Sequence, residues 1–180
     1  MEEMGEELRS NGLQTIGGTN EAGSNEPYRY EELMNYKFDE EVGAVICGID
    51  FQVNYRKISL ASMYIQRGAK WIVCNDDSFT MQSGYRAPGN GMIISAIEDG
   101  LKKSDGSGLI AEKIVTGKPN PAIVDLIRGQ HNITCDRRKM VMIGDRPNTD
   151  ISLGNLAGID SCLVLTGVAQ NVADVEDWAN

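Results

Sequence analysis

Short apolar runs alternate with segments of helical spacing along most of this chain. Residues 42–49 and 71–74 are nearly continuous apolar runs, which are typical of strands buried on both faces of a parallel sheet. Residues 54–67 between them carry apolar side chains three and four positions apart, which predicts an amphipathic helix that ends at Gly68. A strand, a helix and a strand in this order predict an α/β fold.

The same patterns predict further short elements. We expect helices at residues 6–11 and 92–101 and strands at residues 13–16, 114–116 and 140–143. Two segments rich in Gly, Asn and other polar residues, 17–27 and 75–91, are predicted to be loops.

A polar stretch rich in Gly and Ser interrupts this pattern at residues 102–108. We place a domain boundary there, with residues 1–107 in a small α/β domain and residues 108–180 in a second α/β part. Most of the candidate chemistry lies in the second part.

Two carboxylates directly follow the predicted strand at residues 140–143. Gly144 ends the strand, and Asp145 and Asp150 come next, five positions apart. Ligands of open parallel sheets gather at the carboxyl ends of the strands, and Mg²⁺ prefers oxygen ligands such as carboxylates. The two aspartates are therefore candidate Mg²⁺ ligands. Gly, Asp, Asn and Pro also favour turns, and an Asx-rich turn that leaves a strand explains the spacing equally well.

A lysine precedes this pair at the junction of a strand and a helix. The strand at 114–116 leads through Gly117 to Lys118, and the next helix begins beside two prolines, which are favoured in a first helical turn. An ammonium group beside the N–H groups of a helix start is placed to hold an anion, whereas the alternative is a solvated surface lysine. With the strand at 140–143, this segment predicts a βαβ unit. The helix is expected to bury the side chains of Ile123, Val124, Leu126 and Ile127.

The charge of the chain disfavours two classes of partner. The chain has 26 acidic and 17 basic residues and a formal net charge of −9, whereas nucleic acids and anionic membranes require positive surface. No stretch approaches the roughly 20 apolar residues of a membrane span, and the acidic N-terminus shows no secretion signal. We therefore expect a cytoplasmic protein that binds no nucleic acid and no membrane. Four cysteines without CxxC spacing and a single histidine, His131, indicate reduced thiols rather than disulfides or a zinc site.

The order of these segments resembles one enzyme family. Gly117-Lys118-Pro119, followed by Gly144-Asp145-Arg146-Pro147-Asn148-Thr149-Asp150, is similar to the third and fourth motifs of haloacid dehalogenase-type phosphatases. The similarity is greatest to the 4-nitrophenylphosphatase and phosphoglycolate phosphatase group, and it covers about residues 5–170. Four other segments agree with that group, at residues 42–50, 74–77, 88–91 and 163–168.

This resemblance implies a fold and an activity. The fold would be a partial Rossmann-like core of parallel strands and helices, formed by residues 108–180, and a smaller α/β cap domain formed by residues 1–107. The activity would be Mg²⁺-dependent hydrolysis of a small phosphate monoester, with an aspartyl-phosphate formed in the complete enzyme. Because related caps often pair, a homodimer through the cap is compatible with the resemblance.

The resemblance also implies roles for individual residues. Asp145 would be a direct Mg²⁺ ligand, Asp150 would orient a metal-bound water or brace the loop, and Lys118 would neutralise the nucleophile and a phosphate oxygen. Asn75 and Asp77 match the cap loop that faces the active site in relatives, although an Asx turn explains them equally well.

Two departures from the family pattern bear on activity. The nucleophilic aspartate of the family lies in an Asp-x-Asp motif, which this sequence lacks together with the Ser/Thr of the second motif. We therefore expect a middle-to-late portion of a phosphatase that does not turn over by itself. The alternative is a catalytically inactive metal-binding or regulatory module. Cys74 stands where the family commonly has threonine, which alters the expected substrate contacts of the cap loop.

Overall fold

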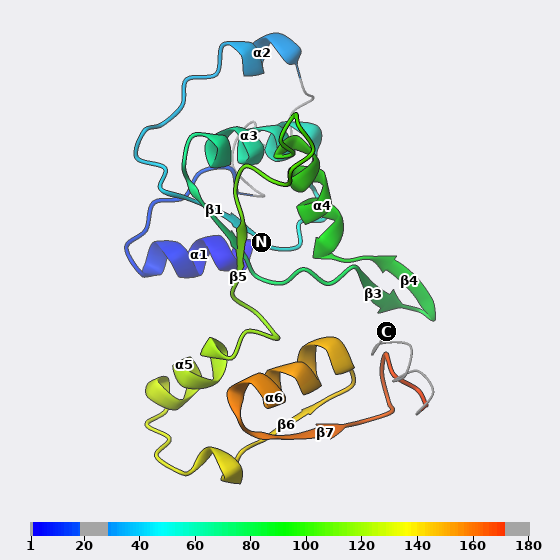
Figure 1. The fold of residues 1–180 in the computed structure, drawn as a ribbon. Helices are drawn as coiled ribbons and strands as arrows, with labels where there is room; N and C mark the ends of the chain where they lie inside the picture. Colours follow the sequence, from blue (N-terminus) through cyan, green and yellow to red (C-terminus); the bar gives the residue numbers. More distant parts are fainter. Residues whose placement is uncertain (1, 19–28, 172–180) are drawn as a thin grey trace. The chain divides into compact units, whose positions relative to one another are not determined.

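The computed structural model describes residues 2–18 and 29–171 of the chain (Figure 1). They form a mixed α/β fold that divides into two compact units, Met1–Ile114 and Val115–Asn180. Leu109 and Ala111 pack against the core of the first unit, so the division comes a few residues after the polar link. Within the described ranges, no helix is long and apolar enough to cross a bilayer.

The first unit is built on a three-stranded sheet with the strand order β1-β2-β5, formed by Ala44–Cys47, Lys70–Val73 and Lys113–Val115. Strands β1 and β2 are parallel and are joined by helix α3, Tyr55–Gln66. The Asn54 side chain caps α3 by accepting a hydrogen bond from the Lys57 amide at 3.0 Å, and Gly68, with a φ of 101°, follows its end. The predicted strand, helix and strand are confirmed.

Two helices, α3 and α4 (Asn90–Gly100), contact each other and β1 to enclose the core of the first unit. Helix α4 confirms the helix predicted at residues 92–101 and begins two residues earlier. The buried side chains of this core are Cys47, Ile65, Trp71, Val73, Ile93, Ile94, Ile97 and Leu101. Trp71 is only 2% exposed, which shows that the layer of two helices packs closely against the sheet.

A β-hairpin follows β2 where the sequence predicted only a loop at residues 75–91. Strands β3 (Phe79–Gln82) and β4 (Tyr85–Pro88) pair in antiparallel register around Ser83 and Gly84, whose φ values are 50° and 83°. Two central residues with positive φ match the twist of a hairpin. The hairpin was missed because its strands have only four residues each and carry no clear alternation of apolar and polar side chains.

The remaining predictions for the first unit are partly wrong. Residues 13–16 form no strand, because Leu13 and Ile16 remain about half exposed without a neighbouring strand. Helix α1 spans Glu2–Ser10 and therefore begins earlier than predicted, and a short helix α2 spans Tyr30–Met34. Most of the loop predicted at residues 17–27 lies outside the described residues. Strand β1 is shorter than the predicted run, and it is buried only toward its end at Cys47, not on both faces.

The second unit is a two-stranded parallel sheet covered by helices. Strands β6 (Val141–Gly144) and β7 (Asp160–Leu163) pair directly. Around them lie α5 (Ala122–Gln130), a short 3₁₀ helix (Arg137–Lys139), a π-helical turn (Pro147–Ile151) and α6 (Ser152–Ala157). The small core contains Val124, Leu153 and Ala157.

The predicted βαβ unit of residues 114–143 does not form. Strand β5 pairs with β2 in the sheet of the first unit, and β6 pairs with β7 alone among the strands that the structure describes. The second unit consequently leaves apolar side chains exposed. The prediction of a buried helix face holds for Ile123 and Val124, whereas Leu126 is 66% and Ile127 41% exposed. The strand predicted at residues 140–143 was also expected to be buried. In β6, however, Val141 and Ile143 are 54% and 60% exposed, because side chains on only one face of the strand pack against the core.

Candidate active site

Lys118 and Asp150 form the central ion pair of the candidate site. The Lys118 ammonium Nζ lies 2.6 Å from Asp150 Oδ1. The Asp150 side chain is only 3% exposed, whereas the Lys118 side chain is 45% exposed. The pair therefore joins a buried carboxylate to a cation that reaches solvent, and the sequence correctly placed these two residues together.

The second oxygen of Asp150 holds the loop that leaves β6. Asp150 Oδ2 accepts hydrogen bonds from the backbone amides of Asp145 at 3.1 Å and Arg146 at 3.0 Å. A buried carboxylate requires such compensation, and charge-assisted bonds are the stronger kind. Of the two roles implied for Asp150, this geometry matches bracing of the loop.

The local sequence explains how Asp150 returns to the start of its own loop. Pro147 opens the π-helical turn, and the Asp150 amide donates to the Arg146 carbonyl at 2.8 Å. The turn brings the Asp150 carboxyl group against Gly144, where a Cβ atom would lie 2.3 Å from Asp150 Cγ. Glycine at position 144 is thus a steric requirement of the ion pair.

Asp145 is held in place from a different part of the chain. Its Oδ2 accepts a hydrogen bond from the Val168 amide at 2.5 Å, and its carbonyl accepts one from the Ala169 amide at 3.1 Å. A Cβ atom at Gly167 would lie 1.9 Å from the same Oδ2. In the described part of the chain, Oδ1 of Asp145 has no hydrogen-bond partner. One oxygen is therefore anchored and the other is available.

This arrangement can bind a phosphate and contribute to a metal site. Lys118 lies in the turn that follows β5. Asn120 closes this turn by donating from Nδ2 to the Val115 carbonyl at 2.7 Å. Asp145 offers one hard oxygen ligand at the carboxyl end of β6, where α/β sheets bind ligands. Among the described residues, no three His, Cys, Asp or Glu side chains gather around a common point. A cation here would take its other ligands from water, phosphate or another segment.

The two residues assigned to the cap loop belong to the first unit, directly after β2. Asn75 Nδ2 donates to Asp77 Oδ2 at 2.7 Å, so the structure brings these two side chains together. Cys74, which precedes them, has its Sγ 3.4 Å from Met4 Sδ, and burial raises the pKa of this thiol. At the position where the family commonly has threonine, this chain thus has a partly buried cysteine whose sulfur contacts Met4.

A segment to which sequence reasoning assigned no role, residues 88–91, holds this loop. Asn90, only 1% exposed, donates from Nδ2 to the Asn75 carbonyl at 2.6 Å. The Gly89 amide donates to the Ser78 carbonyl at 3.0 Å, and the Gly91 amide donates to the Asp77 carbonyl at 2.9 Å. Cβ atoms at Gly89 and Gly91 would lie 2.3 Å and 2.9 Å from the Asp77 carbonyl oxygen. The Pro-Gly-Asn-Gly sequence was the available signal, because two glycines flanking a polar residue favour a close approach of backbone segments.

Comparison with known proteins agrees with the geometry of the second unit. A family model described as HAD-hydrolase-like matches residues 115–179, which include Lys118, Asp145 and Asp150. Over these residues the chain is similar to the haloacid dehalogenase-like hydrolases. The resemblance noted in the sequence is thereby confirmed, including its grouping with 4-nitrophenylphosphatases.

Three similar proteins illustrate this similarity. Phosphoglycolate phosphatase 2 of Arabidopsis thaliana is 30% identical over 91% of this chain and 51% of its own length. The crystal structure of a 4-nitrophenylphosphatase from Thermotoga maritima is 25% identical, with a TM-score of 0.63 over 98% of this chain and 72% of that protein. A glycerol phosphate phosphatase from Mycobacterium tuberculosis, solved in complex with magnesium, is 29% identical, with a TM-score of 0.61 over 72% of this chain and 36% of that protein.

The chain spans about half the length of the curated relatives that it matches. These haloacid dehalogenase-like relatives carry names of phosphatases that act on small phosphorylated compounds, namely glycerol 3-phosphate, acid sugar and phosphoglycolate phosphatases.

Proposed function

We propose that this chain supplies the Lys118 and Asp145 side of a Mg²⁺-dependent phosphate monoester hydrolase. The observation that carries the proposal is the Lys118–Asp150 ion pair beside Asp145 at the end of β6. Asp150 links a cation that reaches solvent to the loop that carries an available carboxylate oxygen, and phosphate and a divalent ion require such a combination of charges. Relatives named as phosphatases support the same class of reaction.

Asp145 is the residue that would hold the metal. Its Oδ1 is a hard oxygen donor without a partner among the described residues, and Val168 fixes the carboxyl group through Oδ2. This donor suits Mg²⁺, which takes one or two carboxylates and completes its shell with water and phosphate oxygens. When bound, Mg²⁺ would neutralise charge on the phosphate and polarise its oxygens.

Lys118 would hold the phosphate while Asp150 holds Lys118. An ammonium group has three donors, and the ion pair with Asp150 uses one of them. The other donors face solvent or a ligand, since the lysine side chain is 45% exposed. Asp150 acts here as a positioning residue whose two oxygens are already occupied by Lys118 and the amides of the loop.

The nucleophile would come from a strand that pairs with β6. The sequence contains no Asp-x-Asp pair, and within the described ranges β6 has a neighbouring strand, β7, on one side only. Val141 and Ile143 on β6 are more than half exposed, as expected for a surface that another strand or helix covers. The aspartate on that strand would attack phosphorus and expel the alcohol, and water would then release inorganic phosphate from the aspartyl-phosphate. The first unit would act as the cap, with Asn75 and Asp77 facing a small phosphorylated substrate.

The proposal is tested by reconstitution. Release of phosphate from 4-nitrophenyl phosphate, phosphoglycolate and glycerol 3-phosphate is measured with Mg²⁺, with the chain alone and with a polypeptide carrying the Asp-x-Asp strand of a relative. We expect no turnover by the chain alone, and turnover of the mixture that is lost in Lys118→Met and when the first Asp of the added strand is changed to Asn. Turnover by the chain alone, or a mixture that binds Mg²⁺ without hydrolysis, would overturn it.

A second prediction concerns the metal and does not depend on turnover. Asp145→Asn is expected to weaken Mg²⁺ binding at least tenfold, because the amide replaces the charged oxygen ligand that Asp145 offers at the end of β6. The measurement is a Mg²⁺ titration that follows the backbone amide signals of Val168 and Ala169. Asp160→Asn, which changes an exposed carboxylate on β7, is the matched control and should leave the titration unchanged. Equal effects of the two variants would show that the ion binds diffusely.

A further inference from the structure

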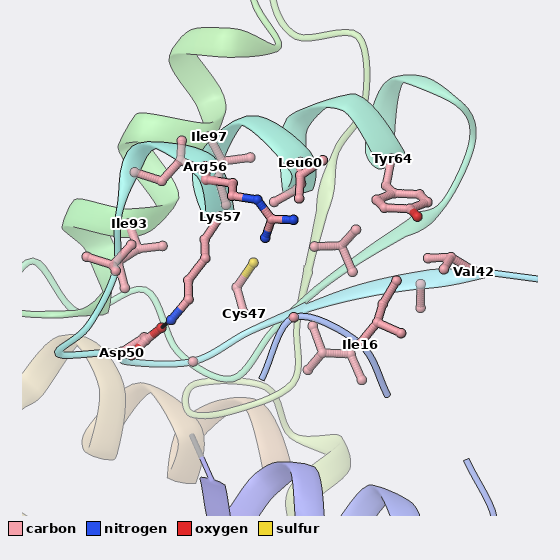
Figure 2. A pocket seen from close by; sticks show the side chains of 18 of the residues that line it. Ile16, Val42, Cys47, Asp50, Arg56, Lys57, Leu60, Tyr64, Ile93 and Ile97 are labelled. Carbon is pink, nitrogen blue, oxygen red and sulfur yellow. Dashed lines mark hydrogen bonds and ion pairs between the residues drawn. The ribbon is translucent and has the colours of Figure 1, made fainter. Parts of the chain in front are cut away.

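A cavity of about 230 Å³ lies in the first unit, along β1 and beneath α3 (Figure 2). It contains none of the residues assigned to the candidate active site. Slightly more than half of its wall is apolar, with contributions from Ile16, Val42, Leu60, Ala61, Ile93 and Ile97. The cavity is smaller than the ~300–1,000 Å³ of pockets for drug-sized ligands, so any ligand enclosed here is small.

Two basic side chains line this cavity, and their partners differ. Lys57 is paired with Asp50, with 2.8 Å between Nζ and Oδ2, and these side chains are 12% and 10% exposed. The Arg56 side chain forms no hydrogen bond or ion pair in the described part of the chain. Figure 2 shows Lys57 turned toward Asp50, whereas the Arg56 guanidinium extends over the space between Leu60 and Cys47.

Among the described residues, no carboxylate pairs with Arg56. Cys47 is protonated at neutral pH, because burial raises its pKa to about 11, so the thiol supplies no negative charge. Asp50 is already paired with Lys57. Arg56 also lies in the first turn of α3, where the positive end of the helix dipole favours an anion. A half-buried guanidinium against an apolar wall is suited to a planar carboxylate, which it binds with two parallel hydrogen bonds.

The number of free charges limits the ligand further. Lys57 and Asp50 form an ion pair with each other, whereas the Arg56 side chain has no ion pair among the described residues and offers one positive charge to a ligand. One guanidinium matches one carboxylate, whereas a phosphate monoester would bring nearly two negative charges. The apolar wall beyond Arg56 suits the hydrocarbon part of such a molecule.

We propose that this cavity binds a small monocarboxylate with an aliphatic chain, its carboxylate on Arg56 and its chain between α3 and β1. The site is separate from the proposed phosphatase chemistry and does not depend on it. It would make the first unit responsive to a short aliphatic acid.

The test titrates the full chain with octanoate and follows backbone amide signals. We expect saturable shifts at Gly48, Arg56 and Ala61, which line the cavity, and much weaker effects of octanol, which has the same chain without the charge. Arg56→Gln should weaken octanoate binding at least tenfold, since a charge-assisted bond is lost, and Arg56→Lys should lie between the two because ammonium cannot bind in the bidentate mode.

Two controls keep the proposal open to refutation. Lys103→Gln removes one positive charge from an exposed loop away from the cavity and should leave octanoate binding unchanged. Because the Arg56 side chain has no partner among the described residues, Arg56→Gln should unfold at the same denaturant concentration as the unaltered chain. Octanol binding as tightly as octanoate, or octanoate binding equally to the Arg56→Gln chain, would refute the assignment.

Discussion

Replacing Asp150 by alanine is expected to lower the free energy of unfolding of the second unit by about 3 kcal/mol. The side chain is almost fully buried and accepts hydrogen bonds from Lys118, Asp145 and Arg146. Its loss leaves two loop amides without an acceptor and a void beside Gly144. Lys118 contributes less to the loss because it is 45% exposed and can be hydrated.

The effect is measured by denaturation followed through the amide signals of β6 and β7, so that the second unit is observed separately. Asp160→Ala is the control, because this carboxylate is exposed on β7, and its effect should stay within about 0.5 kcal/mol. If both alanine variants unfold alike, Asp150 does not brace the loop.

Replacing Gly89 by alanine is expected to destabilise the first unit by about 1–3 kcal/mol and to displace the loop at residues 75–78. The new Cβ would lie 2.3 Å from the Asp77 carbonyl oxygen, and a backbone atom cannot move away as a flexible side chain can. The hydrogen bonds from Gly89 to Ser78 and from Gly91 to Asp77 would then lengthen or break.

This prediction is checked by the denaturation midpoint of the first unit together with the amide signals of Asn75 and Ser78. Gly43→Ala is the matched control, because a Cβ atom at Gly43 would meet nothing within 4 Å. It should be neutral or slightly stabilising, since alanine restricts the unfolded chain. A Gly89→Ala chain as stable as Gly43→Ala would show that the close approach is easily relieved.

The sequence predicted the parts of the fold in which apolar spacing matches secondary structure. The pattern around α3 placed a strand, a helix and a strand correctly, because these elements bury one continuous core that includes Trp71 and Val73. It failed for β3 and β4, whose pairing depends on a turn at Ser83 and Gly84 more than on apolar content. It failed also for the exposed faces of α5 and β6, because spacing indicates which side chains share a face and not whether another element covers it.

The candidate site was predictable as a group of residues but not in its bonding. Motif spacing brought Lys118 near Asp150, although 32 positions separate them. It did not indicate that both oxygens of Asp150 are occupied, nor that Val168, 23 positions after Asp145, fixes the other carboxylate. These contacts depend on how β6 and β7 pair, and no local pattern in the sequence encodes that pairing. The role of Asn90 depends likewise on the tertiary approach of α4 to the loop after β2.

The hydrogen bonds by which Asp150 holds its own loop after β6 affect the expected selectivity for ions. Since the Asp145 and Arg146 amides already donate to Asp150, a cation bound at Asp145 Oδ1 would break neither of these two hydrogen bonds. The energetic difference between competing ions would then arise mainly from how readily each one gives up its hydration water. Affinity at such a ligand would depend mainly on the chemistry of the ion and little on the folding of this loop.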